Sequence, residues 1–111
     1  MKELVQQLTA AYGPSGRETE VADLIEKLLK GKVDSFHRDA LGNLICEKKG
    51  TDKKGKRIMF SAHMDQIGMV VTHIEKEGYL RISGVGGLSV SNLRMRRVKF
   101  QNGVHGVMVE Q

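Results

Sequence analysis

His63 and Asp65 are the two side chains whose types and spacing could form a metal-binding or catalytic pair. They follow the apolar run at residues 57–62, and open α/β sheets place ligands at the carboxyl ends of such strands. In an extended segment, side chains two residues apart lean the same way, so Asp65 can accept a hydrogen bond from one imidazole nitrogen. The other nitrogen is then available to a metal. Because four histidines make a chance His-x-Asp spacing unsurprising, an ordinary structural histidine stays an alternative.

The other candidate ligands and nucleophiles have plain structural explanations. His37, His73 and His105 fall in separate expected strands, where a lone histidine is more often a surface residue than a ligand. Cys46 has no evident base partner and cannot form an internal disulfide, which fits a reducing compartment. The glycine-rich residues 84–87 do not open a helix, so they favour a turn over a phosphate-binding loop.

Two amphipathic helices are expected before the His63–Asp65 pair. Residues 2–11 carry apolar side chains on one helical face, and a Gly-Pro pair ends this helix. A second apolar stripe predicts a helix over residues 16–30. Ser15, with Glu18 three residues later, is typical of a capping box, in which Ser15 accepts from the Glu18 amide and Glu18 reaches back.

After the helices the apolar period changes to two, which indicates strands. Strands are expected at residues 33–38, 44–48, 57–62, 69–74, 79–83, 97–101 and 104–110. The third of these contains the apolar run Ile58-Met59-Phe60, which predicts burial on both faces. Asn102-Gly103 predicts a hairpin, and Gly106 interrupts the following alternation, which predicts a bulge. The pattern therefore changes near residue 68 from mixed helix and strand to β structure alone.

Composition indicates a soluble globular chain, with 111 residues of which 40% are hydrophobic and 28% charged. No apolar run approaches the ~20 residues of a membrane span, and no signal peptide is visible. We therefore expect a cytoplasmic protein with no membrane partner.

The net charge of +5 arises in residues 51–111, which hold ten Lys/Arg and five Asp/Glu. The basic cluster near the end of the chain consists of Arg94, Arg96, Arg97 and Lys99. A nucleic-acid-binding module is therefore an alternative. Phe100 is the only aromatic beside this cluster, whereas nucleic-acid-binding sheets usually offer several, so no specific nucleic-acid partner is expected.

Three segments, in this order and spacing, resemble the amino-terminal part of the glutamyl aminopeptidase and tetrahedral aminopeptidase family, some of whose members are labelled endoglucanases. They are residues 8–18 (LTAAYGPSGRE), 39–45 (DALGNLI) and 60–68 (FSAHMDQIG). The glycine-rich stretch and the Asn-Gly hairpin continue the likeness, which covers essentially the whole chain. Within the third segment, many relatives have Glu where this chain has Gln66.

The resemblance implies a metal-dependent aminopeptidase that removes amino-terminal residues from peptides by a metal-activated water. It implies two divalent metal ions, zinc or cobalt, with His63 as a metal ligand and Asp65 as a catalytic residue that orients His63. The family's remaining ligands and its general base would lie beyond residue 111. The chain thus resembles an amino-terminal portion, expected to be inactive by itself.

The resemblance also implies an α/β fold. Residues 1–68 would form a partial aminopeptidase-like (zinc-peptidase) α/β layer of the catalytic domain. Residues 69–111 would begin an inserted PDZ-like β-barrel domain, which mediates assembly into homo-oligomers from dimers to dodecamers. The alternatives that stay open are a related same-clan zinc exopeptidase or amide deacylase, a non-catalytic assembly fragment, and the basic nucleic-acid-binding module.

Overall fold

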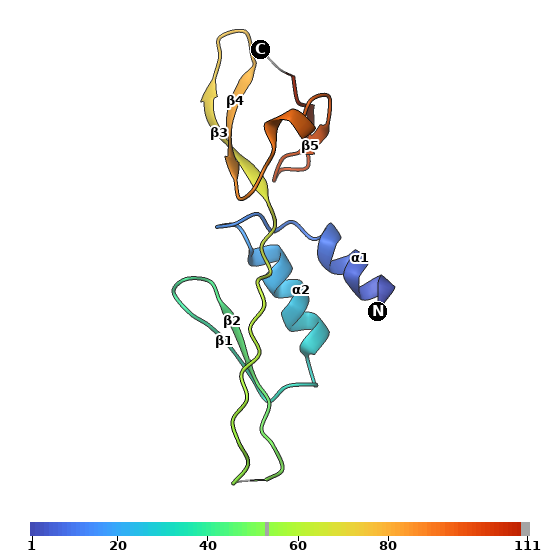
Figure 1. Cartoon of the computed structure of the whole chain (residues 1–111), viewed down its shortest axis with the longest axis vertical. Helices are drawn as coiled ribbons and strands as arrows, with labels where there is room; N and C mark the ends of the chain where they lie inside the picture. Colours follow the sequence, from blue (N-terminus) through green and yellow to red (C-terminus); the bar gives the residue numbers. More distant parts are fainter. Residues whose placement is uncertain (53, 110–111) are drawn as a thin grey trace. The chain divides into compact units, whose positions relative to one another are not determined.

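The computed structural model describes residues 1–52 and 54–109. The described residues fall into two units, one before and one after the boundary between Gln66 and Ile67. The first unit holds both α-helices and one β-hairpin, and the second holds two further hairpins, so the chain is mixed α/β (Figure 1). No helix in the described part of the chain is long and apolar enough to cross a membrane.

The two predicted helices are present as α1 (Lys2–Ala10) and α2 (Thr19–Leu29). The apolar stripe of α2 turns Val21 and Ala22 inward, and these are among the few buried side chains of the described chain. α2 begins three residues later than the pattern predicts, because residues 14–17 form a turn in which the Arg17 amide donates to the Pro14 carbonyl at 2.8 Å.

The capping-box prediction is only half right. Glu18 precedes α2, and its carboxylate does reach back, accepting a hydrogen bond from the Gly16 amide. No side chain caps the helix, however, and the Ser15 hydroxyl donates to a carboxylate elsewhere in the unit. The Ser15 hydroxyl thus bonds to a carboxylate instead of the helix end. A hydrogen bond to a charged acceptor is stronger than one between neutral groups.

The first hairpin pairs β1 (Ser35–Arg38) with β2 (Leu44–Glu47) in antiparallel register. Asp39 organises its turn, because its carboxylate accepts hydrogen bonds from the Leu41 amide, the Asn43 amide and the Asn43 side chain at 3.0, 2.9 and 2.7 Å. These donors, the Asn43 side chain foremost, hold the pKa of Asp39 below its ordinary value. Both strands lie where the sequence predicts them.

The predicted third strand, residues 57–62, is not a strand in the described structure. Ile58, Met59 and Phe60 are 76%, 88% and 92% exposed. A strand buried on both faces needs hydrogen-bonded neighbours at its edges and packed layers above and below it. Within the described residues no strand pairs with this run, so its apolar side chains remain exposed to solvent.

The second unit contains the hairpin of β3 (Gly68–Ile74) with β4 (Leu80–Val85) and that of β5 (Arg97–Lys99) with β6 (His105–Val107). A short 3₁₀ helix, Val90–Asn92, lies between them. Both hairpins were predicted, and the Asn-Gly turn places Gly103 at φ +85°, a conformation that glycine adopts without steric cost.

The bulge predicted at Gly106 is absent, because Val98 and Gly106 pair in a regular register. A Cβ atom at Gly106 would lie 3.2 Å from Phe100 Cε2, so the glycine makes room for an aromatic ring. The described strands pair as three separate two-stranded sheets, and a closed PDZ-like barrel stays a prediction.

Candidate functional site

The loop that joins α1 to α2 lies against the segment that follows His63. The Gln66 amide donates to the Gly13 carbonyl at 2.8 Å, and the Gln66 side-chain Nε2 donates to the Ala11 carbonyl at 3.0 Å. Pro14 and Gln66 form a parallel β-bridge. The loop therefore contacts Gln66, the residue directly after Asp65, at three backbone positions.

Gly13 allows this close approach. It is buried, and a Cβ atom there would lie 2.7 Å from Val21 Cγ1 and 3.2 Å from Val21 Cβ. Val21 itself is only 4% exposed and is packed in the small core of the unit. A side chain at position 13 would therefore push the loop away from α2.

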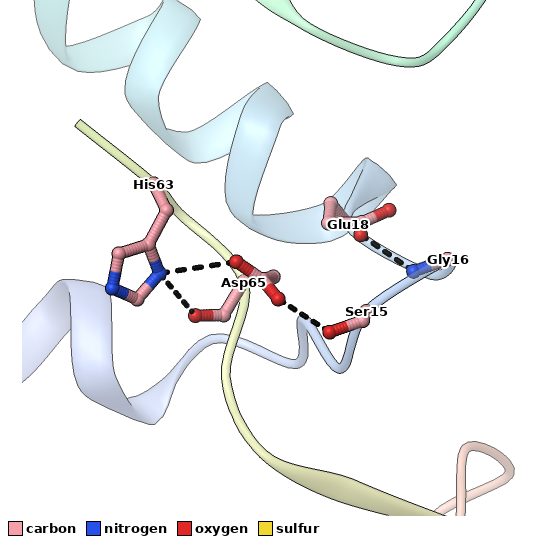
Figure 2. Close-up of polar contacts among 5 residues, drawn as sticks. All are labelled: Ser15, Gly16, Glu18, His63 and Asp65. Atoms are coloured by element: carbon pink, nitrogen blue, oxygen red, sulfur yellow. Dashed lines mark hydrogen bonds and ion pairs between the residues drawn. The ribbon is translucent and has the colours of Figure 1, made fainter. Parts of the chain in front are cut away.

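His63 and Asp65 are in direct hydrogen-bonding contact. His63 Nδ1 lies 3.0 Å from Asp65 Oδ1 and 3.1 Å from the Asp65 carbonyl oxygen (Figure 2). The Asp65 pKa is below its ordinary value, so the side chain is an ionised acceptor at neutral pH and Nδ1 must carry the donated hydrogen. The second ring nitrogen, Nε2, then has a free lone pair when the imidazole is neutral.

Ser15 completes the group. Its hydroxyl donates to Asp65 Oδ2, the carboxylate oxygen that His63 does not use, so one carboxylate joins the two residues (Figure 2). The hydrogen bond from Ser15 is the main reason that the Asp65 pKa is lowered, and the bond from His63 is the second. Figure 2 also shows the bond between Glu18 and Gly16 at the start of α2.

Sequence reasoning selected His63 and Asp65 but gave Ser15 and Gln66 no part in the site. Ser15 is 50 residues from Asp65, and no local spacing rule links positions so far apart. Ser15 also matched a familiar helix-start pattern, which offered a sufficient local explanation for its presence.

The other candidate residues lie apart from this group in the sequence and stay without an assigned role. His37 is on β1, His73 on β3 and His105 on β6. Cys46 is a free, half-buried thiol on β2. Over residues 1–52 and 54–109, no three His, Cys, Asp or Glu side chains converge in a way that could hold a metal ion.

The His63–Asp65 pair fits one part of a metal site. Metal-binding histidines usually donate their second ring nitrogen to a carboxylate, which fixes the tautomer and the ring orientation. Here Nδ1 makes that bond and the His63 side chain is 87% exposed, which leaves Nε2 accessible. The described donor set therefore fits one metal ligand with its supporting carboxylate.

Comparisons with known proteins identify the family of this chain. The sequence model of the family described as M42 glutamyl aminopeptidase matches residues 42–110. A protein of Acetivibrio thermocellus named "Putative aminopeptidase" is 47% identical over 108 residues, which are 97% of this chain and 32% of the relative.

Two solved structures are also similar. A Thermotoga maritima structure titled as an endoglucanase has a TM-score of 0.87 and 39% identity over 95% of this chain and 33% of its own. The Pyrococcus horikoshii TET1 peptidase, described as assembling into a tetrahedron or a large octahedral shell, has a TM-score of 0.82 and 35% identity over 99% of this chain and 33% of its own.

The chain spans about a third of the length of each of these three proteins. The family model, in contrast, matches more than half of the chain itself. The chain therefore belongs to the M42 glutamyl aminopeptidase family.

Proposed function

We propose that residues 1–111 form the amino-terminal portion of a metal-dependent aminopeptidase, which removes amino-terminal residues from peptides by hydrolysis. The observation that carries this proposal is the exposed His63 imidazole held through Nδ1 by Asp65, in a chain of an aminopeptidase family. Aminopeptidase activity needs a polarised scissile carbonyl and an activated water, and a histidine of this geometry suits a metal that serves both.

His63 would supply one imidazole ligand to a divalent metal, and Asp65 would hold its ring. By resemblance to the family, a complete site would take two ions, zinc or cobalt. When bound, such ions activate a water and stabilise negative charge on the carbonyl oxygen. A catalytic zinc ordinarily has about three protein ligands, so His63 alone would not bind zinc tightly.

The chain would contribute to two domains of an oligomeric enzyme. We assign residues 1–68 to the catalytic domain and residues 69–111 to the start of an inserted, PDZ-like β domain. Assembly of the TET1 peptidase into closed shells supports a homo-oligomeric parent. The single free cysteine suits a cytoplasmic location.

The activity can be tested in a hybrid protein. In it, residues 1–111 replace the corresponding third of the Acetivibrio thermocellus relative, which is 47% identical. We expect metal-dependent hydrolysis of leucyl or glutamyl amides by the hybrid, lost on chelation and lost with His63→Ala. The matched control is His37→Ala, which removes an exposed strand histidine and should leave turnover unchanged.

The 111-residue chain alone should show no turnover with zinc, cobalt or manganese added. Hydrolysis by this chain that disappears with His63→Ala would contradict the expectation that further ligands are needed. A folded hybrid that cleaves N-acyl amino acids instead of aminoacyl amides would favour the deacylase alternative. Sequence-selective nucleic-acid binding that survives physiological salt would favour the basic module.

A further inference from the structure

We propose that Ser15 is a positioning residue: through Asp65 it holds His63 in the tautomer that leaves Nε2 free for a metal. The inference rests on the proposed function for its biological purpose. The contacts that support it, between Ser15, Asp65 and His63, lie within this chain.

The two oxygens of the Asp65 carboxylate have different partners. Oδ2 accepts from the Ser15 hydroxyl and Oδ1 faces His63 Nδ1 at 3.0 Å. The terminal torsion of an aspartate is broad and roughly two-fold, so a carboxylate without a second partner can rotate away. Occupation of Oδ2 by Ser15 leaves Oδ1 as the oxygen directed at the imidazole.

Ser15 is itself held in place by the contacts that its loop makes with Gln66. The carbonyls of Ala11 and Gly13 accept hydrogen bonds from Gln66, which is the residue after Asp65. Pro14, next to Ser15, forms the parallel bridge with the same residue. The hydroxyl and the carboxylate are therefore carried by two backbone segments that are fastened together, so their contact does not depend on a mobile loop.

The Ser15 hydroxyl makes no hydrogen bond that caps the neighbouring helix α2. Ser15 does not cap α2, whose first turn receives no side-chain cap. The start of α2 is organised instead by Glu18, which accepts from the Gly16 amide. Removal of the Ser15 hydroxyl should thus act mainly on Asp65, and through it on His63.

The test reads the tautomer of His63 in the metal-free chain. Long-range ¹H–¹⁵N correlation of the ¹⁵N-histidine-labelled 111-residue chain, at a pH where imidazole is neutral, distinguishes Nδ1–H from Nε2–H. The four histidines are assigned with single His→Gln variants. We expect the Nδ1–H form to predominate at His63, although free histidine in water favours Nε2–H.

In Ser15→Ala the ratio of Nδ1–H to Nε2–H should fall about three- to tenfold, the range that one ordinary hydrogen bond supports. Ser15→Thr keeps a hydroxyl and should restore the ratio. The matched control is Ser35→Ala, which removes another exposed serine that donates to a carboxylate, that of Glu47 at 3.4 Å. This control should leave His63 unchanged.

A wild-type His63 in the Nε2–H form, or a folded Ser15→Ala chain with an unchanged ratio, overturns the proposal. If Ser15→Ala does not fold, Ser15→Cys offers a weaker donor of similar shape, and an intermediate ratio is expected. If both variants unfold while Ser15→Thr folds, the hydroxyl serves the fold and the proposal is wrong. An inactive hybrid with the expected tautomer ratios would refute the peptidase function and leave the role of Ser15 standing.

Discussion

Gly13→Ala should destabilise the first unit, because the added methyl group has no space. The new Cβ would lie 2.7 Å from Val21 Cγ1, closer than real Cβ contacts come. Val21 cannot swing aside easily, since it is 4% exposed and its branched side chain strongly prefers one rotamer in a helix. The loop must then move off α2, taking the Gly13 carbonyl away from the Gln66 amide.

The expected cost is about 1–3 kcal/mol, the usual range for overpacking a filled site. Urea unfolding, monitored by far-ultraviolet circular dichroism, should show a lower midpoint. The slope of the free energy of unfolding against urea concentration should be unchanged. In a unit of this size, each kcal/mol lowers Tm by about 4–8 °C. The same variant should weaken protection of the Gln66 amide against hydrogen exchange.

Two further variants isolate the contact. Gly50→Ala is the matched control, because a Cβ there meets nothing within 4 Å, and it should change stability little. In the double variant Gly13→Ala/Val21→Ala the 2.7 Å contact with Cγ1 disappears and only the 3.2 Å contact with the Cβ of residue 21 remains, so the loss should be smaller than the sum of the two single losses. Equal stability of Gly13→Ala and wild type, or strict additivity in the double variant, would refute the steric argument.

Three more outcomes are expected. Gln66→Glu replaces the amide that donates to the Ala11 carbonyl with an acceptor, so unfolding in urea at neutral pH should become easier by about 1 kcal/mol; unchanged stability would show that the bond contributes nothing. Because the Asp39 pKa is lowered in the folded hairpin, its stabilisation is complete above the ordinary carboxyl pKa and is lost as pH falls toward the folded value. Hydrogen-exchange protection of the turn should fall there in wild type but show no such decline in Asp39→Asn. Phe60 is 92% exposed in an apolar run, so the chain should self-associate at high concentration, and Phe60→Lys should reduce the associated fraction in sedimentation velocity; an identical distribution would place association elsewhere.

Local patterns predicted the elements that local physics stabilises. The apolar stripe of α2 and the Asn-Gly turn between β5 and β6 each determine a structure from neighbouring residues alone. Residues 57–62 have the composition of a buried strand, yet a strand of that kind exists only with neighbours at its edges, and none pairs with it in the described chain. The composition of a segment indicates whether it suits a buried or an exposed strand. Whether a buried strand forms depends on the neighbouring strands and layers that cover it.

Of the two side-chain contacts to Asp65 in the candidate site, the sequence predicted one, that with His63. His63 and Asp65 stand two residues apart, so their contact follows from an extended backbone. The Ser15 contact follows from how two distant segments meet, which no spacing in the sequence encodes. Gly106 shows the same limit: the residue was noticed, but its reason is an aromatic ring that folding brings against it.

The bridge between Pro14 and Gln66 also bears on the order in which the chain folds. Ser15 and Asp65 are 50 residues apart, and closing a loop of that length costs about 1.4 kcal/mol more in chain entropy than closing one of ten residues. The helices and the β1–β2 hairpin can form from near neighbours, whereas this closure must wait for them to lie together. We therefore expect the oriented imidazole of His63 to appear late in folding, so that its tautomer reports completion of the first unit.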